Sequence, residues 1–260
     1  MIKVLVNGAL GRMGQAVVAA VARDSDLQLV GATDIRSADD IGEVVGLGKL
    51  GVAVTADLET AIKEVKPDVM VDFTEPAVVF ENAKKALQLG VSPVIGTTGL
   101  TDEQKKELAA LAEKTPCFIA PNFAIGAIIL MLASKMAAKY LEDVEIIELH
   151  HDKKLDAPSG TALETAKMIA EIRPSHKQGN PNEKELLTGA RGAEYDGIPI
   201  HSVRLPGYVA HQEVIFGGLG QTLTIRHDSL NRESFMPGVC LACKKVKDLK
   251  GLVIGLDKIL

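Results

Sequence analysis

Short apolar runs alternate with helical patterns through the first half of this 260-residue chain. Such alternation is typical of a parallel β-sheet with helices on its faces. In sheets of this kind ligands bind beyond the carboxyl ends of the strands, so we expect the loops after these strands to border one crevice. The sequence predicts strands at Ile2–Val6, Leu27–Thr33, Val52–Thr55, Val69–Phe73, Pro93–Ile95 and Cys117–Ala120, and helices at Gly14–Arg23, Ala77–Gly90 and Asp102–Lys114.

The pattern changes after Phe123. It predicts a long apolar helix, a strand that ends at His150, a second helix from Thr161, an excursion rich in Gly, Pro and Asn, three strands that alternate as in an antiparallel sheet, and a closing helix. The apolar helix is expected at Ala127–Tyr140, the excursion at 173–197 and the closing helix at Phe235–Lys247. The three strands are expected at Ile198–Leu205, Glu213–Phe216 and Gln221–Arg226.

The expected fold class is therefore α/β, a Rossmann-type doubly wound parallel sheet plus an inserted α+β domain with a mixed or antiparallel sheet. Residues 1–124 and 233–260 are expected to form the first domain, and residues 125–232 the second.

Charge and composition exclude several classes of partner. The net charge is −5 and basic residues are spread along the chain, whereas nucleic acids and anionic membranes need a concentrated basic face. No run approaches the ~18 apolar residues of a membrane span, and the N-terminus lacks the pattern of a signal peptide. The three cysteines, an odd count, indicate a reducing compartment. We expect a cytoplasmic protein with no nucleic-acid or membrane partner and no metal.

Three glycines, Gly8, Gly11 and Gly14, lie between the first predicted strand and the first predicted helix. A dinucleotide-binding turn requires this context: Gly8 permits the tight turn, Gly11 lets the backbone approach a pyrophosphate, and Gly14 lets helix and strand pack closely. The pyrophosphate would lie on the helix N-terminus. Because the spacing is G-x-x-G-x-x-G and not the commoner G-x-G-x-x-G, a glycine-rich turn without a ligand stays open as the alternative.

Asp34 ends the second predicted strand, where an acid accepts hydrogen bonds from the adenosine ribose of a bound dinucleotide. The acid favours NAD, since a 2′-phosphate would meet its charge. Arg36 or Arg12 can pair with such a phosphate, however. We therefore expect both NADH and NADPH to be usable, with the preference left open.

The segment ELHHDKKLDAPSGTAL, at 148–163, brings two histidines close to two lysines. Histidine titrates near neutral pH and a partly buried lysine can be brought toward it, so both residue types suit proton transfer. The alternative is a strand end followed by solvated charges.

A Pro-Ser-Gly-Thr turn follows in the same segment. Thr161 and Glu164 have the spacing of a capping box, which predicts that a helix begins at Thr161. The N–H groups around Ser159, Gly160 and Thr161 would then be free to hold a carboxylate. A simple helix cap without a ligand is the alternative.

Taken together these motifs resemble the dihydrodipicolinate reductase family, also called the 4-hydroxy-tetrahydrodipicolinate reductase family. The resemblance runs essentially the full length of the chain, and the histidine–lysine motif is its most specific part. It rests on GALGRMG at 8–14, DFTEP at 72–76, GTTG at 96–99, PNFAIG at 121–126, HHDKKLDAPSGTA at 150–162 and HSVRLPGYVAHQEVIFGGLGQTLTIRHDS at 201–229.

The resemblance implies a dinucleotide-binding domain and a substrate-binding domain that also builds a homotetramer through its sheet. His150 and Lys154 match the family's proposed proton donors, and Arg232 matches an arginine near the hinge. The residues implied to hold the substrate carboxylates are His151, Ser159, Gly160 and Thr161. Those implied to bind the cofactor are Gly8, Ala9, Leu10, Gly11, Arg12, Met13, Asp34, Gly96, Thr97, Thr98, Ala120, Pro121, Asn122 and Phe123.

Two positions depart from the family pattern. Some members have an acid followed at once by arginine, whereas here Ile35 separates Asp34 from Arg36, which puts recognition of a 2′-phosphate in doubt. Ala124 stands where a serine is expected.

The implied reaction removes water from a small cyclic dicarboxylate, 4-hydroxy-tetrahydrodipicolinate, and reduces the resulting dihydrodipicolinate to tetrahydrodipicolinate in the diaminopimelate pathway of lysine biosynthesis. Hydride from the nicotinamide would reach the ring while His150 or Lys154 delivers a proton, and the sequence leaves open which of the two does so.

Other functions stay open. Another two-domain nicotinamide oxidoreductase, such as a diaminopimelate or sugar dehydrogenase, would not need the paired histidines and the Ser-Gly-Thr helix start. A redox sensor that binds NADH would tolerate the loss of His150. A relative could also keep the fold without the activity.

Overall fold

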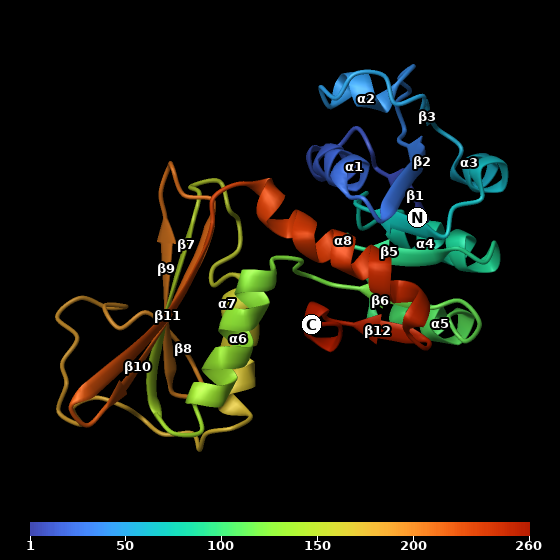
Figure 1. Cartoon of the computed structure of the whole chain (residues 1–260). Coiled ribbons are helices and arrows are strands. Elements are labelled where there is room, and N and C mark those ends of the chain that lie inside the picture. The colour runs from blue at the N-terminus through green and yellow to red at the C-terminus, as the bar shows by residue number, and fades with distance from the viewer. The chain divides into compact units, whose positions relative to one another are not determined.

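The computed structural model describes residues 1–260, which divide into two compact units (Figure 1). Unit 1 comprises residues 1–125 and 232–260, and unit 2 comprises residues 126–231. Neither unit contains a helix with the length and apolar character needed to cross a lipid bilayer.

Unit 1 is built on a seven-stranded sheet in which every neighbouring pair of strands is parallel. Its strands are β1 (Ile2–Asn7), β2 (Leu27–Thr33), β3 (Val54–Thr55), β4 (Val69–Asp72), β5 (Ser92–Ile95), β6 (Cys117–Ile119) and β12 (Leu252–Ile254). Their order is β12-β6-β5-β4-β1-β2-β3, so the direction of winding reverses at β1. In such sheets the ligand crevice lies at the carboxyl ends of the strands beside this reversal.

Helices cover both faces of this sheet. The α-helices are α1 (Arg12–Arg23), α2 (Ile41–Val44), α3 (Leu58–Val65), α4 (Val79–Gln88), α5 (Asp102–Leu111) and α8 (Met236–Lys245), with short 3-10 turns at Arg232–Phe235, Val246–Asp248 and Leu256–Lys258. α1 and α8 contact each other, and α3, α4 and α5 contact one another in a row (Figure 1). The sequence from Val4 to Val6 is an uninterrupted apolar run because β1 is buried from both sides.

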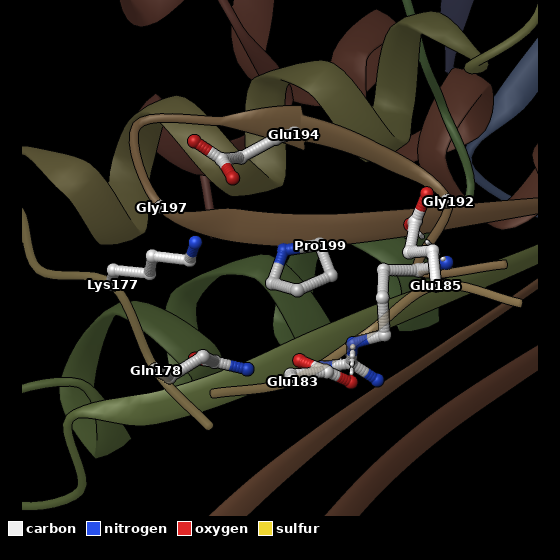
Figure 2. A pocket seen from close by; sticks show the side chains of 9 residues that line it. Lys177, Gln178, Glu183, Glu185, Gly192, Glu194, Gly197 and Pro199 are labelled. Carbon is white, nitrogen blue, oxygen red and sulfur yellow. Dashed lines mark hydrogen bonds and ion pairs between the residues drawn. The ribbon is translucent and has the colours of Figure 1, made fainter. Parts of the chain in front are cut away.

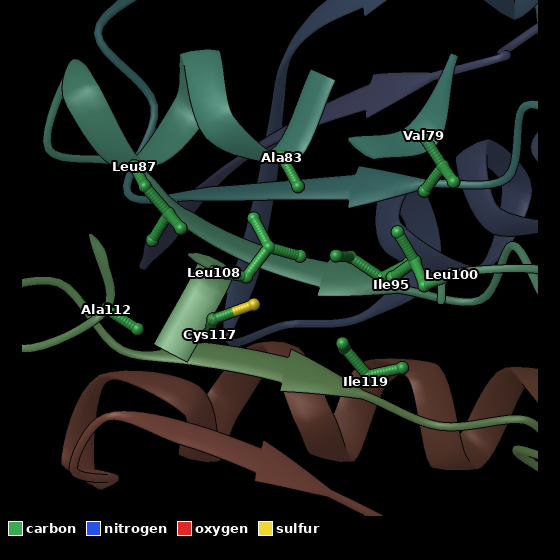
Figure 3. Close-up of a cluster of buried hydrophobic side chains, with 9 residues drawn as sticks. All are labelled: Val79, Ala83, Leu87, Ile95, Leu100, Leu108, Ala112, Cys117 and Ile119. Atoms are coloured by element: carbon green, nitrogen blue, oxygen red, sulfur yellow. The ribbon is translucent and has the colours of Figure 1, made fainter. Parts of the chain in front are cut away.

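A compact apolar cluster joins α4 and α5 to the strands beneath them (Figure 3). Leu108 of α5 and Cys117 of β6 are fully buried in it, and burial raises the pKa of the Cys117 thiol to about 12. The sulfur is therefore a packed apolar atom and not a reactive thiolate. The cluster consists of Val79, Ala83, Leu87, Ile95, Leu100, Leu108, Ala112, Cys117 and Ile119.

Unit 2 is a five-stranded mixed sheet with two helices. Its strands are β7 (Asp143–His150), β8 (Ala193–Tyr195), β9 (Ile198–Arg204), β10 (Ala210–Gly218) and β11 (Gln221–Ser229), in the order β11-β10-β7-β9-β8. β7 and β9 are parallel and the other pairs antiparallel. Helices α6 (Ile125–Ala137) and α7 (Gly160–Ala170) lie on one side of the sheet (Figure 1). Val144 and Ile146 of β7 are buried while alternate residues are partly exposed, the period of a sheet with one covered face.

The predicted fold class is confirmed, and most predicted elements are present with ends shifted by a few residues. Four elements were not predicted: α2, α3, β8 and β12. The closing helix is shorter than predicted, because a 3-10 turn stands at each of its ends.

Candidate active site

The glycine turn of unit 1 is shaped by contacts that exclude side chains. Gly8 has φ +80°, and a Cβ there would lie 2.6 Å from the Phe73 carbonyl oxygen. A Cβ on Gly14 would lie 2.0 Å from the Gly8 carbonyl oxygen. Gly11 is the N-cap of α1, and no side chain caps this helix. The N–H groups of its first turn therefore meet no side-chain acceptor, an arrangement that fits a dinucleotide pyrophosphate.

Asp34 fixes this turn to the end of β2. Its Oδ2 accepts a hydrogen bond of 3.0 Å from the Leu10 N–H, and its Oδ1 lies 3.3 Å from Arg36 Nε. The Asp34 side chain is only 8% exposed, whereas that of Arg36 is 64% exposed. Arg36 thus offsets the charge of Asp34 while staying free to turn toward solvent.

Asp72, at the end of β4, collects polar side chains from several strand ends. It is fully buried, and Oδ2 accepts from Asn7 Nδ2 at 2.8 Å. Oδ1 accepts from Thr74 Oγ1 at 2.7 Å and from Thr97 Oγ1 at 2.8 Å, and Asn82 donates to Oδ2. This carboxylate therefore joins the end of β1 to the loops after β4 and β5.

The remaining predicted cofactor residues differ in exposure. Thr98 and Pro121 are exposed, and Asn122 is half-buried with its Oδ1 accepting from the Ala124 N–H. Ala120 and Phe123 are buried, and the Phe123 ring packs against that of Phe73 with centroids 5.9 Å apart. A Cβ on Gly96 would lie 2.1 Å from the same Phe73 ring. Ala120 and Phe123 thus support the loops, whereas Thr98 and Pro121 are open to solvent.

In unit 2, β7 carries a buried carboxylate two residues before its end. Glu148 is fully buried, and its Oε2 contacts Nδ1 of His150. Arg204 of β9 donates to both oxygens, at 2.8 and 2.7 Å, and the Ser159 N–H donates to Oε1 at 3.2 Å. Burial by itself would raise the pKa of Glu148, but the hydrogen bonds from His150, Arg204 and Ser202 lower it to about 2.

Lys154 lies in the loop that follows β7. Its Nζ donates to Asp156 Oδ1 at 2.7 Å, and this hydrogen bond lowers the pKa of Asp156. The Lys154 side chain is 21% exposed and that of His150 13% exposed, so both are partly buried, while His151 is exposed. The end of β7 and the loop after it therefore hold an imidazole and an ammonium that are both partly buried.

The start of α7 differs from the prediction. Ser159, not Thr161, is the N-cap, and its Oγ accepts from the Ala162 N–H at 3.2 Å. The predicted capping box is wrong, because the turn is already closed two residues earlier and Glu164 lies near Lys167 instead. The Ser159 N–H is also not free, since Glu148 accepts it. Gly160 is exposed with open space around its Cα, so an anion can approach the helix start there.

The excursion before β8 forms a separate polar pocket (Figure 2). None of the predicted site residues lines it, and its walls include the acids Glu183, Glu185 and Glu194, which disfavour a dicarboxylate. Arg191 forms ion pairs with Glu145 of β7 at 2.6 Å and with Glu183 at 3.2 Å.

Sequence reasoning did not assign a role to Glu148, Arg204 or Asp72. Glu148 and Asp72 could have been singled out from the sequence, because each is a charged residue inside or directly after an apolar run that is typical of a buried strand. No sequence pattern indicated the contact of Arg204 with Glu148, since 56 residues separate the two.

Comparisons with known proteins agree with the motifs. The family described as dihydrodipicolinate reductase, N-terminus, matches residues 2–123, and that described as dihydrodipicolinate reductase, C-terminus, matches residues 126–260. Relatives from Desulfitobacterium hafniense and Geobacillus thermodenitrificans, both named 4-hydroxy-tetrahydrodipicolinate reductase, are each 56% identical to the chain. These alignments cover 100% of this chain and 98% and 99% of the two relatives.

Solved structures give the same result. The dipicolinate-bound dihydrodipicolinate reductase from Paenisporosarcina sp. TG-14 has a TM-score of 0.91 and 54% identity, covering 100% of both chains. An amine dehydrogenase from Mycobacterium smegmatis has a TM-score of 0.70 at 16% identity, covering 100% of this chain and 96% of that one, a likeness of fold alone. With both family descriptions matched and more than half of the residues shared over its full length, the chain belongs to the dihydrodipicolinate reductase family.

Proposed function

We propose that the chain catalyses the NAD(P)H-dependent reduction of 4-hydroxy-tetrahydrodipicolinate, through dihydrodipicolinate and with loss of water, to tetrahydrodipicolinate in the diaminopimelate pathway of lysine biosynthesis. The observation that carries this proposal is the end of β7 and the loop after it. Glu148 contacts His150 and the Ser159 N–H at the start of α7, and Lys154 is linked to the same carboxylate through Asp156 and Arg204. Proton donors and an anion site within one loop are what reduction of a ring dicarboxylate requires.

Unit 1 would hold the cofactor, which supplies hydride when it is bound. The first turn of α1, with Gly8 to Met13, would bind the pyrophosphate, and Asp34 the adenosine ribose. The exposed residues of the loops at Gly96–Thr98 and Ala120–Phe123 would border the nicotinamide. Since Arg36 already offsets the charge of Asp34, both NADH and NADPH are accepted in this proposal.

Unit 2 would hold the substrate. The α7 start would bind one carboxylate through Gly160 and Thr161, with Ser159 as the N-cap that positions them, and the exposed His151 would bind the other. His150 and Lys154 would offset the negative charge that develops on the ring, and one of them would deliver the proton to the ring carbon.

The same proposal includes a cytoplasmic homotetramer with no nucleic-acid or membrane partner. α6 and α7 lie on one side of the unit 2 sheet, and its opposite face carries half-buried apolar residues such as Ile147 and Ile215 among charged ones. A face of this composition is suited to association of copies through their sheets.

Two variants test the assignment in an assay coupled to the condensation of pyruvate with aspartate semialdehyde, followed by the absorbance of the reduced nicotinamide. His150→Gln and Lys154→Ala should each lower kcat at least about tenfold, because each removes a proton donor, while the KM for NADH stays constant. Lys153→Ala is the matched control, since this neighbouring lysine is exposed, and it should keep normal turnover.

Wild-type turnover in both site variants would refute the roles of His150 and Lys154. An inactive native protein would refute the function itself.

A further inference from the structure

Glu148 is placed to do more than join two strands. Its side chain has no exposed surface, and hydrogen-bond donors surround both oxygens. Arg204 bridges the two oxygens, His150 occupies the Oε2 side, and the Ser159 N–H occupies the Oε1 side. The carboxylate therefore contacts both the proton donor before the loop and the helix start after it.

We propose that Glu148 is a positioning residue of the reaction: it holds a proton on Nδ1 of His150, so that Nε2 is the nitrogen that exchanges a proton with the substrate, and it fixes the α7 start relative to that imidazole. The proposal rests on the function proposed above and names the residue through which His150 acts.

The protonation state of Glu148 sets the orientation of the His150 proton. A carboxylate bridged by the two Nη groups of an arginine is ionised, and the low pKa of Glu148, about 2, agrees with this. An ionised carboxylate only accepts hydrogen bonds, so Nδ1 of His150 must be the donor. The Nε2 atom then carries the acceptor lone pair in neutral His150 and the second proton in the imidazolium.

The same carboxylate orders a loop that has few other restraints. Most residues from His151 to Ala157 are exposed, and Leu155 is fully exposed. Arg204, which Glu148 holds, donates to the Asp156 carbonyl oxygen at 2.7 Å, and Asp156 in turn accepts from Lys154. Removing the charge of Glu148 should therefore disturb His150, Lys154 and Ser159 together.

A glutamine at position 148 gives a sharp test, because its NH2 group must take the place of either Oε1 or Oε2. On the Oε1 side it would oppose two donors, the Ser159 N–H and Arg204 Nη2. On the Oε2 side it opposes Arg204 Nη1, and it can donate to His150 Nδ1 if that nitrogen gives up its proton. The hydroxyl of Ser202, which also donates to this carboxylate, can rotate to accept instead. Glu148→Gln should therefore convert neutral His150 from the Nδ1–H to the Nε2–H tautomer.

The tautomer can be read by long-range ¹H–¹⁵N NMR on protein labelled at histidine, with His150 assigned by the signal missing from His150→Gln. The native protein should show Nδ1–H, and Glu148→Gln should show Nε2–H. Glu145→Gln is the matched control, because Glu145 lies on the same strand and also binds an arginine and a histidine, Arg191 and His201. It should leave the His150 tautomer unchanged.

Kinetics supply the second readout. Glu148→Gln should lower kcat at least about tenfold with an unchanged KM for NADH, because an amide in place of the acid favours the wrong tautomer of the imidazole. Because part of the effect of Glu148 acts through His150, Glu148→Gln combined with His150→Gln should lower kcat by less than the product of the two single losses.

Three results would overturn the proposal: an Nε2–H tautomer in the native protein, an Nδ1–H tautomer retained in Glu148→Gln, or losses in kcat that multiply in the double variant. The tautomer of His150 in the native protein tests the proposal even if Glu148→Gln does not fold. It is also independent of turnover, so failure of the proposed function is recognised separately, by an inactive native protein.

Discussion

Asp72 is a buried carboxylate whose hydrogen bonds come from neutral groups. The donors are the side chains of Asn7, Thr74, Asn82 and Thr97 and the Thr74 N–H. Glu148 instead has an arginine beside it. Five donors share the two oxygens of Asp72, and the loss of these acceptors would leave several polar groups unpaired, including those of the buried Asn7 and Thr97.

Asp72→Ala should therefore lower the free energy of unfolding by at least about 3 kcal/mol, since each buried donor left without an acceptor costs about 1–3 kcal/mol. Urea unfolding measures this change. Asp102→Ala is the control, because Asp102 is 84% exposed and its removal should cost under about 0.5 kcal/mol. A loss below about 1 kcal/mol for Asp72→Ala would contradict the role described for its hydrogen bonds.

Among the elements, α7 shows how a short motif can mislead about a helix boundary. Thr161 and Glu164 have the spacing of a capping box, and so the sequence pattern alone favours Thr161. Ser159 also has a hydroxyl that can cap a helix, and it lies two residues earlier. The hydrogen bond from its N–H to Glu148 of β7 favours Ser159 over Thr161 as the N-cap. That contact depends on the tertiary structure.

Ser159→Ala should lower the stability of the chain by about 1 kcal/mol, the usual cost of removing a serine N-cap. Glu164→Ala should change it by less than about 0.5 kcal/mol, because Glu164 has no capping role and is exposed. Thermal unfolding of the native chain and of the two variants measures these changes in stability. A larger effect for Glu164→Ala would restore the helix start at Thr161.

How far the sequence predicted the elements depends on burial. β1 and β4 contain continuous apolar runs, Val4–Val6 and Val69–Val71, because both faces are covered there, and these strands were found. β12 was missed because it is a three-residue edge strand that is only partly buried. α3 had a usable signal, since Leu58, Ala61 and Ile62 have helical spacing after Asp57, which caps the helix.

The same limit applies to the candidate site. Residues that are neighbours in sequence, such as His150 and Lys154, could be grouped from the motif alone. Arg204 and Glu148 are brought together only by the pairing of β9 with β7.

At the scale of the whole molecule, carboxylates with lowered pKa values occur in both units. Asp24 and Asp68 in unit 1, and Glu148 and Asp228 in unit 2, all have pKa values below the ordinary ones. Burial opposes the shift in all four, and hydrogen bonds, most of them from cationic or backbone groups, outweigh it. A carboxyl whose pKa is lower in the folded state stabilises the fold above its unfolded pKa and loses that contribution as the pH falls through its folded pKa.

The melting temperature should therefore fall as the pH is lowered from about 4.5, the ordinary pKa of the Glu148 carboxyl, toward about 2, its value in the fold. Calorimetry across this range measures the change. In Glu148→Gln the fall should be shallower, because one of the contributing carboxyls is gone. A melting temperature that rises with acid would contradict this linkage.

β12 is formed by some of the last residues of the chain, and it pairs with β6 from the first half. A ribosome therefore delivers all of residues 126–231 before it releases the strand that closes the sheet of unit 1. Until then the outer edge of β6 stays without its neighbour, and Leu252 is absent from the apolar cluster around Cys117. The inserted unit can thus acquire its structure during synthesis before β12 completes the sheet of unit 1.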